Sequence, residues 1–171
     1  MPSVTERLSR LPRKRPLVSL AVAVLACELV GSSGSVFTVV GLESWYATLA
    51  RPALAPPNWV FGPVWTALFA LMGVAVWLVW RAVDGPRAGV ARVALGVFAA
   101  HFVLNVGWSA VFFGLRSLLG GLVVIVALWL AIVVTILVFD RVDRRAAALL
   151  IPYLAWVTFA GYLNYAFWRL N

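Results

Sequence analysis

The sequence predicts an all-α membrane protein, a compact bundle of five transmembrane helices. Hydrophobic residues make up 64% of the 171 residues and charged residues only 12%, whereas roughly a quarter of the residues of a soluble domain are charged. The apolar residues gather in five segments of about 20 residues or more, long enough at ~1.5 Å per residue to cross a hydrocarbon core of ~30 Å. Because no water pairs with the backbone there, such runs are expected to be helices.

The segments follow one another with short connections, so consecutive helices should be antiparallel neighbours in one domain, residues 17–171. A disordered basic tail is predicted for residues 1–16, which hold five Arg and Lys residues and show no apolar periodicity. A basic stretch before an apolar run is also typical of a signal peptide, but no A-x-A site closes a short apolar core, so a retained membrane helix is the interpretation adopted. The predicted helices cover residues 17–40, 59–80, 90–113, 118–139 and 147–168.

The Arg and Lys residues are distributed unevenly between the two ends of the predicted bundle. Eleven lie in the tail and around the second and fourth connections, and three, Arg51, Arg116 and Arg169, lie at the opposite end. Because basic residues concentrate in cytoplasmic loops, the N-terminus is expected in the cytoplasm. The net charge of +8 is assigned to contact with anionic lipid rather than with nucleic acid. We expect a multi-pass protein of a bacterial cell membrane, with the lipid bilayer as its partner.

The connection between the first two segments, Trp45–Trp65, is unlike a simple turn, because it contains three Trp, one Tyr, one Phe and four Pro residues. Proline fixes φ and removes a backbone donor, so Arg51–Pro57 should be extended and stiff. This composition predicts a cap or a pocket wall. The next helix is expected to begin at Gly62 with Pro63 in its first position, or at Asn58 with a kink at Pro63.

Bulky side chains recur at helical spacing on three segments. Trp65 and Phe69 share a face of the second segment, Asn105 and Trp108 share a face of the third, and Trp156 lies on the fifth. Such stripes are usually helix packing. However, transmembrane packing seams favour small residues, and rigid aromatic rings around a polar amide suit a flat apolar ligand. The pattern therefore indicates a pocket, with packing as the alternative.

The segment that begins at Trp45 reads W-Y-x-x-L-x-R-P-x-L-x-P-P-x-W-V-F-G-P-V-W-x-x-L-F-x-x-M-G. It closely resembles the signature of the TspO/MBR family, the tryptophan-rich sensory proteins and translocator proteins once described as peripheral-type benzodiazepine receptors. The resemblance covers about residues 17–170. It continues as L-N-V-G-W at 104–108, F-F-G at 112–114, P-Y-L-A-W at 152–156 and L-N-Y at 163–165.

The resemblance implies a function. In TspO-like proteins a cavity at the loop end of the bundle binds porphyrins and synthetic aromatic ligands, and the matching motifs place Tyr46, Trp65, Asn105 and Trp156 there. This implies a membrane sensor or carrier that binds a tetrapyrrole, either porphyrin or haem, as its ligand and requires no cofactor. The candidate ligand-binding residues are Tyr46, Pro56, Trp65, Phe69, Asn105, Trp108, Pro152 and Trp156.

Two other functions stay open. Some TspO-like proteins promote light- and oxygen-dependent breakdown of porphyrin, and Trp156 and Tyr46 match the residues implicated in that photo-oxidation. The sequence contains no conventional catalytic set, because it has no Ser-His-Asp group, no paired carboxylates at workable spacing and no Gly-rich phosphate loop. A transporter of porphyrins or sterol-like lipids is the other alternative, although five helices without an internal repeat differ from the usual repeat-built carriers.

Polar residues inside the apolar segments are expected to have partners. An unpaired Asn105 amide would be costly there, so it should bond another helix or a ligand. His101 could ligate a haem iron, but a hydrogen-bonded packing role is preferred, and no metal site is predicted. Glu28 should face the bundle or stay protonated, and pairing with a neighbouring hydroxyl is favoured over proton coupling. The one cysteine, Cys27, is expected to pack as a small apolar side chain.

Two short patterns concern partners. Leu163, Tyr165 and Arg169 fit L-x-Y-x₃-R, a weak cholesterol-contact pattern. In the mitochondrial relatives this end of the fifth helix is linked to cholesterol, whereas in a bacterium without sterols Tyr165 and Arg169 are better interpreted as interfacial anchors. Gly96-x₃-Ala100 permits close approach of two helices, which predicts a homodimer.

The sequence departs from the family pattern at three positions. It has Arg51 where many members have lysine, and Leu54 where many have an aromatic residue. The missing ring is expected to loosen the loop or alter the choice of ligand. Gly120 stands where several members have tryptophan, so contacts attributed to that tryptophan do not apply to this chain.

Overall fold

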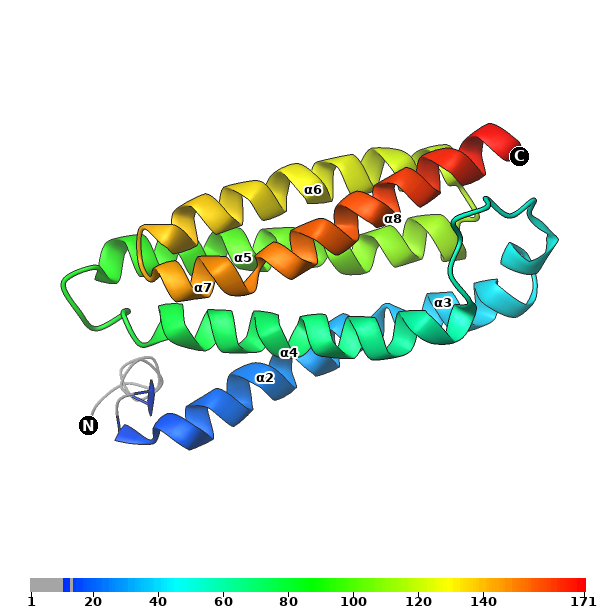
Figure 1. The fold of residues 1–171 in the computed structure, drawn as a ribbon. Coiled ribbons are helices and arrows are strands. Elements are labelled where there is room, and N and C mark those ends of the chain that lie inside the picture. The colour runs from blue at the N-terminus through cyan, green and yellow to red at the C-terminus, as the bar shows by residue number, and fades with distance from the viewer. Residues whose placement is uncertain (1–10, 13) are drawn as a thin grey trace.

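The bundle is described by a computed structural model of residues 11–12 and 14–171 (Figure 1). In this part of the chain, five helical stretches are long and apolar enough to cross a membrane, which confirms the predicted fold class. Most of the predicted tail lies outside the described residues, and Leu11, Pro12 and Lys14 are helical rather than disordered. The elements are α2 (Pro16–Ser33), α3 (Ser35–Glu43), α4 (Phe61–Trp80), α5 (Ala88–Ser109), η3 (Ala110–Gly114), α6 (Leu118–Asp140), α7 (Arg144–Leu149) and α8 (Ile151–Leu170).

The first membrane segment is two helices, not the single helix predicted for residues 17–40. Gly34 separates α2 from α3. The residues around the break, 31–35, read Gly-Ser-Ser-Gly-Ser, and these residue types have lower helix propensity than leucine or alanine. Gly31 also permits close packing on α4, because a Cβ there would lie 2.4 Å from the Phe69 ring.

Two prolines lie where helices begin. A 3₁₀ turn, η2 (Asn58–Val60), leads directly into α4, so Pro63 falls in the first turn of α4. The first N–H groups of a helix have no helical partner, so this proline needs no kink. The helical turns therefore begin at Asn58, and Pro63 lies in the first turn of α4. The last segment is also divided, because Leu150 separates α7 from α8 and Pro152 lies at the start of α8.

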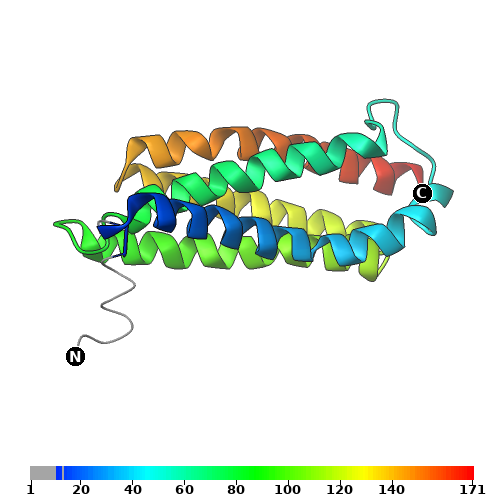
Figure 2. The same ribbon diagram turned by 90° about the horizontal axis from the view of Figure 1, so that it is seen from below.

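α2 packs closely on α4, whereas α3, which follows it, does not. A Cβ on Gly73 of α4 would lie 2.5 Å from Val24 Cα of α2. Nearer the start of α2, the Trp77 indole Nε1 donates a hydrogen bond to Ser19 Oγ at 3.0 Å. Beyond Gly34, α3 packs on the π-helical turn η3, and the α3 and α4 ribbons diverge toward the loop end (Figure 2).

Asn164 joins three helices in the core of the bundle. Its side chain is 1% exposed. Its Oδ1 accepts a hydrogen bond from Trp108 Nε1 of α5 at 3.1 Å, and its Nδ2 donates to the Leu118 carbonyl of α6 at 2.9 Å. Gly121 provides the space, because a Cβ there would lie 2.9 Å from Asn164 Oδ1. Since unpaired polar groups are costly in an apolar core, this amide fixes how α5, α6 and α8 pack.

Candidate ligand cavity

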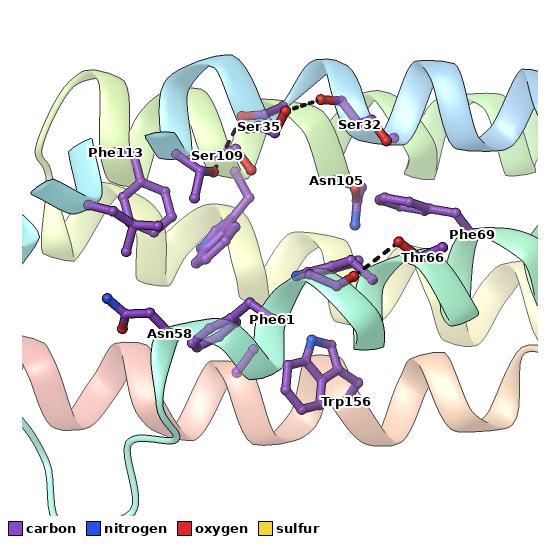
Figure 3. A pocket seen from close by; sticks show the side chains of 18 of the residues that line it. Ser32, Ser35, Asn58, Phe61, Thr66, Phe69, Asn105, Ser109, Phe113 and Trp156 are labelled. Carbon is purple, nitrogen blue, oxygen red and sulfur yellow. Dashed lines mark hydrogen bonds between the residues drawn. The ribbon is translucent and has the colours of Figure 1, made fainter. Parts of the chain in front are cut away.

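A cavity lies between the helices at the end of the bundle where the loop joins α3 to α4 (Figure 3). Its volume is about 320 Å³, within the ~300–1,000 Å³ common for ligand pockets. Residues of α2, α3, α4, α5 and α8 line it, together with Gly34 and with one residue each from the turns η1 (Tyr46–Thr48), η2 and η3. Six of the eight candidate residues are among the lining residues: Tyr46, Trp65, Phe69, Asn105, Trp108 and Trp156.

Aromatic rings form one side of the cavity. Trp65 stacks on Phe69 with ring centroids 5.3 Å apart and an interplanar angle of 28°. The edge of Tyr153 also packs on Trp65, with centroids 6.2 Å apart. Trp156 of α8 lies beside Phe61 of α4 (Figure 3), with ring centroids 5.9 Å apart. Rings packed on other rings present stiff, flat apolar faces.

Asn105 supplies an amide to the cavity lining. The side chain is 5% exposed, and its Nδ2 donates a hydrogen bond to the Tyr153 hydroxyl of α8 at 2.9 Å. The expected partner on another helix is therefore present. Tyr153 was not predicted as that partner, although it lies within the P-Y-L-A-W motif.

Hydroxyl groups form the side of the cavity opposite Trp156 (Figure 3). Ser35 Oγ donates to the Ser32 carbonyl at 2.6 Å, and Thr38 Oγ1 donates to the Gly34 carbonyl at 3.4 Å. Because both hydroxyl protons are donated to nearby backbone carbonyls, the two hydroxyl oxygens can act toward a ligand only as weak acceptors. This side of the cavity was not predicted from the sequence. Its signal was the Gly-Ser-Ser-Gly-Ser run inside an apolar segment.

The cavity opens where α2 and α3 face α4. Its exposed lining residues come from these two sides: Ser32 and Ser35 on one, and Asn58, Gly62 and Thr66 on the other. In this region α3 packs on η3 rather than on α4. The break at Gly34 and the divergence of the two helices therefore create the opening.

Comparison with known proteins supports the family resemblance that the sequence motifs indicated. The profile of the TspO/MBR family matches residues 23–169. The chain belongs to the TspO/MBR family. It is 45% identical over 157 residues to the tryptophan-rich protein TspO of Chlorobaculum tepidum, an alignment that covers 92% of this chain and 98% of that protein. TspO of Archaeoglobus fulgidus is 39% identical over 155 residues, which cover 91% of this chain and 98% of that protein. The translocator protein of Bos taurus is 35% identical over 156 residues, which cover 91% of this chain and 92% of that protein. This member is a multi-pass membrane protein.

Two residues proposed for the TspO/MBR cavity do not lie among its described lining residues. Pro152 is exposed on α8, and the next residue, Tyr153, is the one that faces inward, with no exposed surface. Pro56 is half-buried in the loop, where its carbonyl accepts a hydrogen bond from Arg51 Nη2 at 3.0 Å. Their assignment to the cavity wall is corrected accordingly.

Two buried nitrogen atoms have no hydrogen-bond partner among the described residues, namely Trp156 Nε1 in the cavity wall and His101 Nε2. His101 lies outside the lining, with its Nδ1 3.1 Å from Thr135 Oγ1, which fits a packing role.

The described part of the chain holds no group of three or more His, Cys, Asp or Glu side chains that could bind a metal. Cys27 is buried, and Glu28 is half-buried on α2.

The TspO/MBR loop is attached to the bundle at two points. Tyr46 is buried with its ring centroid 5.0 Å from that of Phe167, and the Arg51 guanidinium lies 5.6 Å from the same Tyr46 ring. Burial raises the pKa of the Tyr46 phenol, and the Arg51 charge opposes that shift. The Ala50 N–H donates to Asn171 Oδ1 at 2.8 Å, and Asn171 Nδ2 donates back to the Ala50 carbonyl at 3.2 Å. The loop is thereby tied to the end of α8.

The three residues of the cholesterol-contact pattern do not form one surface. Leu163 is 5% exposed and belongs to the core, whereas Tyr165 is 46% exposed. Arg169 is exposed, and Tyr165 packs beside Trp168 with ring centroids 6.0 Å apart. This arrangement favours interfacial anchors over a single sterol-binding face.

Proposed function

We propose that the protein binds a tetrapyrrole, either a porphyrin or haem, in this cavity and acts as a membrane sensor or carrier of it. The observation that supports this is the presence of Trp65, Trp108 and Trp156 around one cavity that the Asn105 amide also lines. Flat aromatic faces hold flat apolar ligands, and a few polar groups fix their orientation. Relatives named tryptophan-rich sensory protein and translocator protein fit a sensor or a carrier. Binding of this kind needs no cofactor.

The proposal includes an orientation in the membrane. The connections between α4 and α5 and between α6 and α7 carry exposed arginines at the end of the bundle opposite the loop. If those connections are cytoplasmic, as the positive-inside rule predicts, the N-terminus is cytoplasmic and the loop lies outside. The cavity would then open toward the outer half of the bilayer.

Replacing Asn105 with leucine tests the site. We expect Asn105→Leu to weaken protoporphyrin binding about five- to 150-fold, because a polar contact worth ~1–3 kcal/mol is removed from a water-poor cavity. The measurement is a titration of the purified protein with protoporphyrin in darkness, followed by quenching of tryptophan fluorescence.

Tyr153→Phe is the matched control for Asn105→Leu. It removes the same hydrogen bond inside the protein but leaves the amide in the cavity wall. We expect it to lose much less affinity than Asn105→Leu. If Asn105→Leu binds protoporphyrin with wild-type affinity, or if the two variants lose equal affinity, the proposed contact between the ligand and the amide is wrong.

We also propose a homodimer that forms through α5. Gly96 and Ala100 are exposed, and a Cβ on Gly96 would meet no atom within 4 Å, so this face can approach a second copy closely. Gly96→Leu should raise the fraction of monomer in detergent, measured as molar mass by light scattering. Val126→Leu, a lipid-facing change on α6, is the control. A dimer fraction in Gly96→Leu equal to that of wild type would exclude this interface.

A further inference from the structure

The cavity lining is uncharged. None of the described lining residues is acidic or basic. They are aromatic, aliphatic, small, hydroxyl-bearing or amide-bearing. A carboxylate buried against such a wall would lose its hydration and gain no opposite charge, which is costly. An acidic ligand of this cavity therefore has to keep its carboxylates near the opening, or to find a cation there.

Arg51 is a cation in contact with two of the lining residues. Its Nη2 donates a hydrogen bond to Asn58 Oδ1 at 3.3 Å, and its guanidinium lies 5.6 Å from the Tyr46 ring. Both Asn58 and Tyr46 line the cavity, and Asn58 is exposed at its opening. The Pro56 carbonyl accepts a second hydrogen bond from Nη2 at 3.0 Å. Arg51 is thus held beside the opening by the stiff loop.

The Arg51 side chain can be reached by a ligand from outside the bundle. No ion pair joins Arg51 to a carboxylate among the described side chains, and Arg51 itself is exposed. Both described side-chain hydrogen bonds use Nη2, so the N–H groups of Nε and Nη1 remain. Guanidinium N–H groups form strong, charge-assisted hydrogen bonds with carboxylates.

The size of the cavity places the edge of a large ligand at the same point. At about 320 Å³ the cavity is near the lower limit of ligand pockets, ~300 Å³. A four-ring macrocycle with its side chains is large for that volume, so part of its rim would remain at the opening. The acidic side chains of such a ligand are the part best kept in contact with water and with Arg51.

We propose that Arg51 binds a carboxylate of the ligand at the opening, so that the cavity selects flat apolar molecules that carry an acidic edge over neutral ones. The inference rests on the proposed function and names the ligand class of the same site. Sequence motifs alone did not assign this role to Arg51. Arg51 is a specificity-determining residue in this view, while the aromatic wall provides the contact area.

Two probes that differ in charge test the proposal. Protoporphyrin carries two carboxylates, and its dimethyl ester has the same macrocycle without charge. Each is titrated into the purified full-length protein, its Arg51→Gln variant and its Arg51→Lys variant. We expect wild type to prefer the acid, and Arg51→Gln to lose about tenfold in affinity for the acid, as expected for one charge-assisted contact, while its affinity for the ester stays unchanged. Arg51→Lys, which keeps the charge, should lose less.

The outcomes separate this inference from the proposed function. Equal affinity of wild type for acid and ester overturns the role of Arg51 without using any variant. Equal losses for acid and ester in Arg51→Gln also overturn it, because they show that Arg51 only holds the loop. If the wild-type protein binds neither the acid nor the ester, the proposed tetrapyrrole site itself is overturned instead. Unchanged ester binding in Arg51→Gln would also show that this variant is folded.

Discussion

Alanine in place of Gly73 is expected to lower the stability of the bundle by about 1–3 kcal/mol, the usual cost of overpacking a core. The added Cβ would lie 2.5 Å from Val24 Cα, 3.0 Å from Val24 N and 3.1 Å from the Ala23 carbonyl oxygen. These are backbone atoms, so no side chain can rotate out of the way and α2 has to move off α4. The measurement is the thermal unfolding midpoint in detergent, which should fall.

Gly107→Ala on α5 is the control for this change, because it lies outside the proposed dimer contact at Gly96 and Ala100. It makes the same substitution in a helix, but its Cβ would meet no atom within 4 Å. Both variants gain the higher helix propensity of alanine, about 1 kcal/mol over glycine. The difference between their midpoints therefore reports the contact between α2 and α4. If Gly73→Ala unfolds at the same temperature as Gly107→Ala, the close approach of the two helices is not present in solution.

Leucine in place of Asn164 should destabilise the protein by about 1–3 kcal/mol, because buried polar groups lose their partners. The Trp108 indole N–H loses its acceptor, and the Leu118 carbonyl loses the amide that donates to it. The shape of the side chain is nearly kept, so packing changes contribute little. Thermal unfolding in detergent measures the loss.

Asn171→Leu is the matched control for the Asn164 change. It removes an asparagine that also bonds two partners, the Ala50 backbone and the Phe167 carbonyl, but at an exposed position. Water or lipid headgroups can replace its hydrogen bonds, so the loss should be smaller. Equal midpoints in the two variants would show that burial of Asn164 does not make its hydrogen bonds more important.

The positions of the helices could be predicted from the sequence because apolar runs are bounded by polar residues. The fourth run was predicted as 118–139 and is observed as Leu118–Asp140, where the Ser117 side chain accepts from the Gly120 N–H as a cap. The break at Gly34 was missed for a physical reason. Hydrophobicity depends on composition, and uncharged glycine and serine do not interrupt an apolar run even where they interrupt a helix.

The cavity was predicted less completely than the helices. Helical spacing shows which residues share a face, but not which neighbour that face meets. Pro152 and Trp156 are one turn apart on α8, yet Pro152 is exposed and Tyr153 beside it points inward. The place of Tyr46 came from the family resemblance. The hydroxyl wall combines residues of α2 and α3 with Ser109 of α5, and such an assembly depends on contacts between helices that no local pattern encodes.

The burial of Cys27 has a practical consequence for spectroscopic labelling. It is the one cysteine of the sequence, and it is 4% exposed in the core cluster, where a thiol is poorly accessible to reagents. A new cysteine at an exposed loop position such as Leu54, which is 62% exposed, would therefore be the accessible thiol of an otherwise native chain. A spin label or dye attached there would report on the loop without any need to replace Cys27.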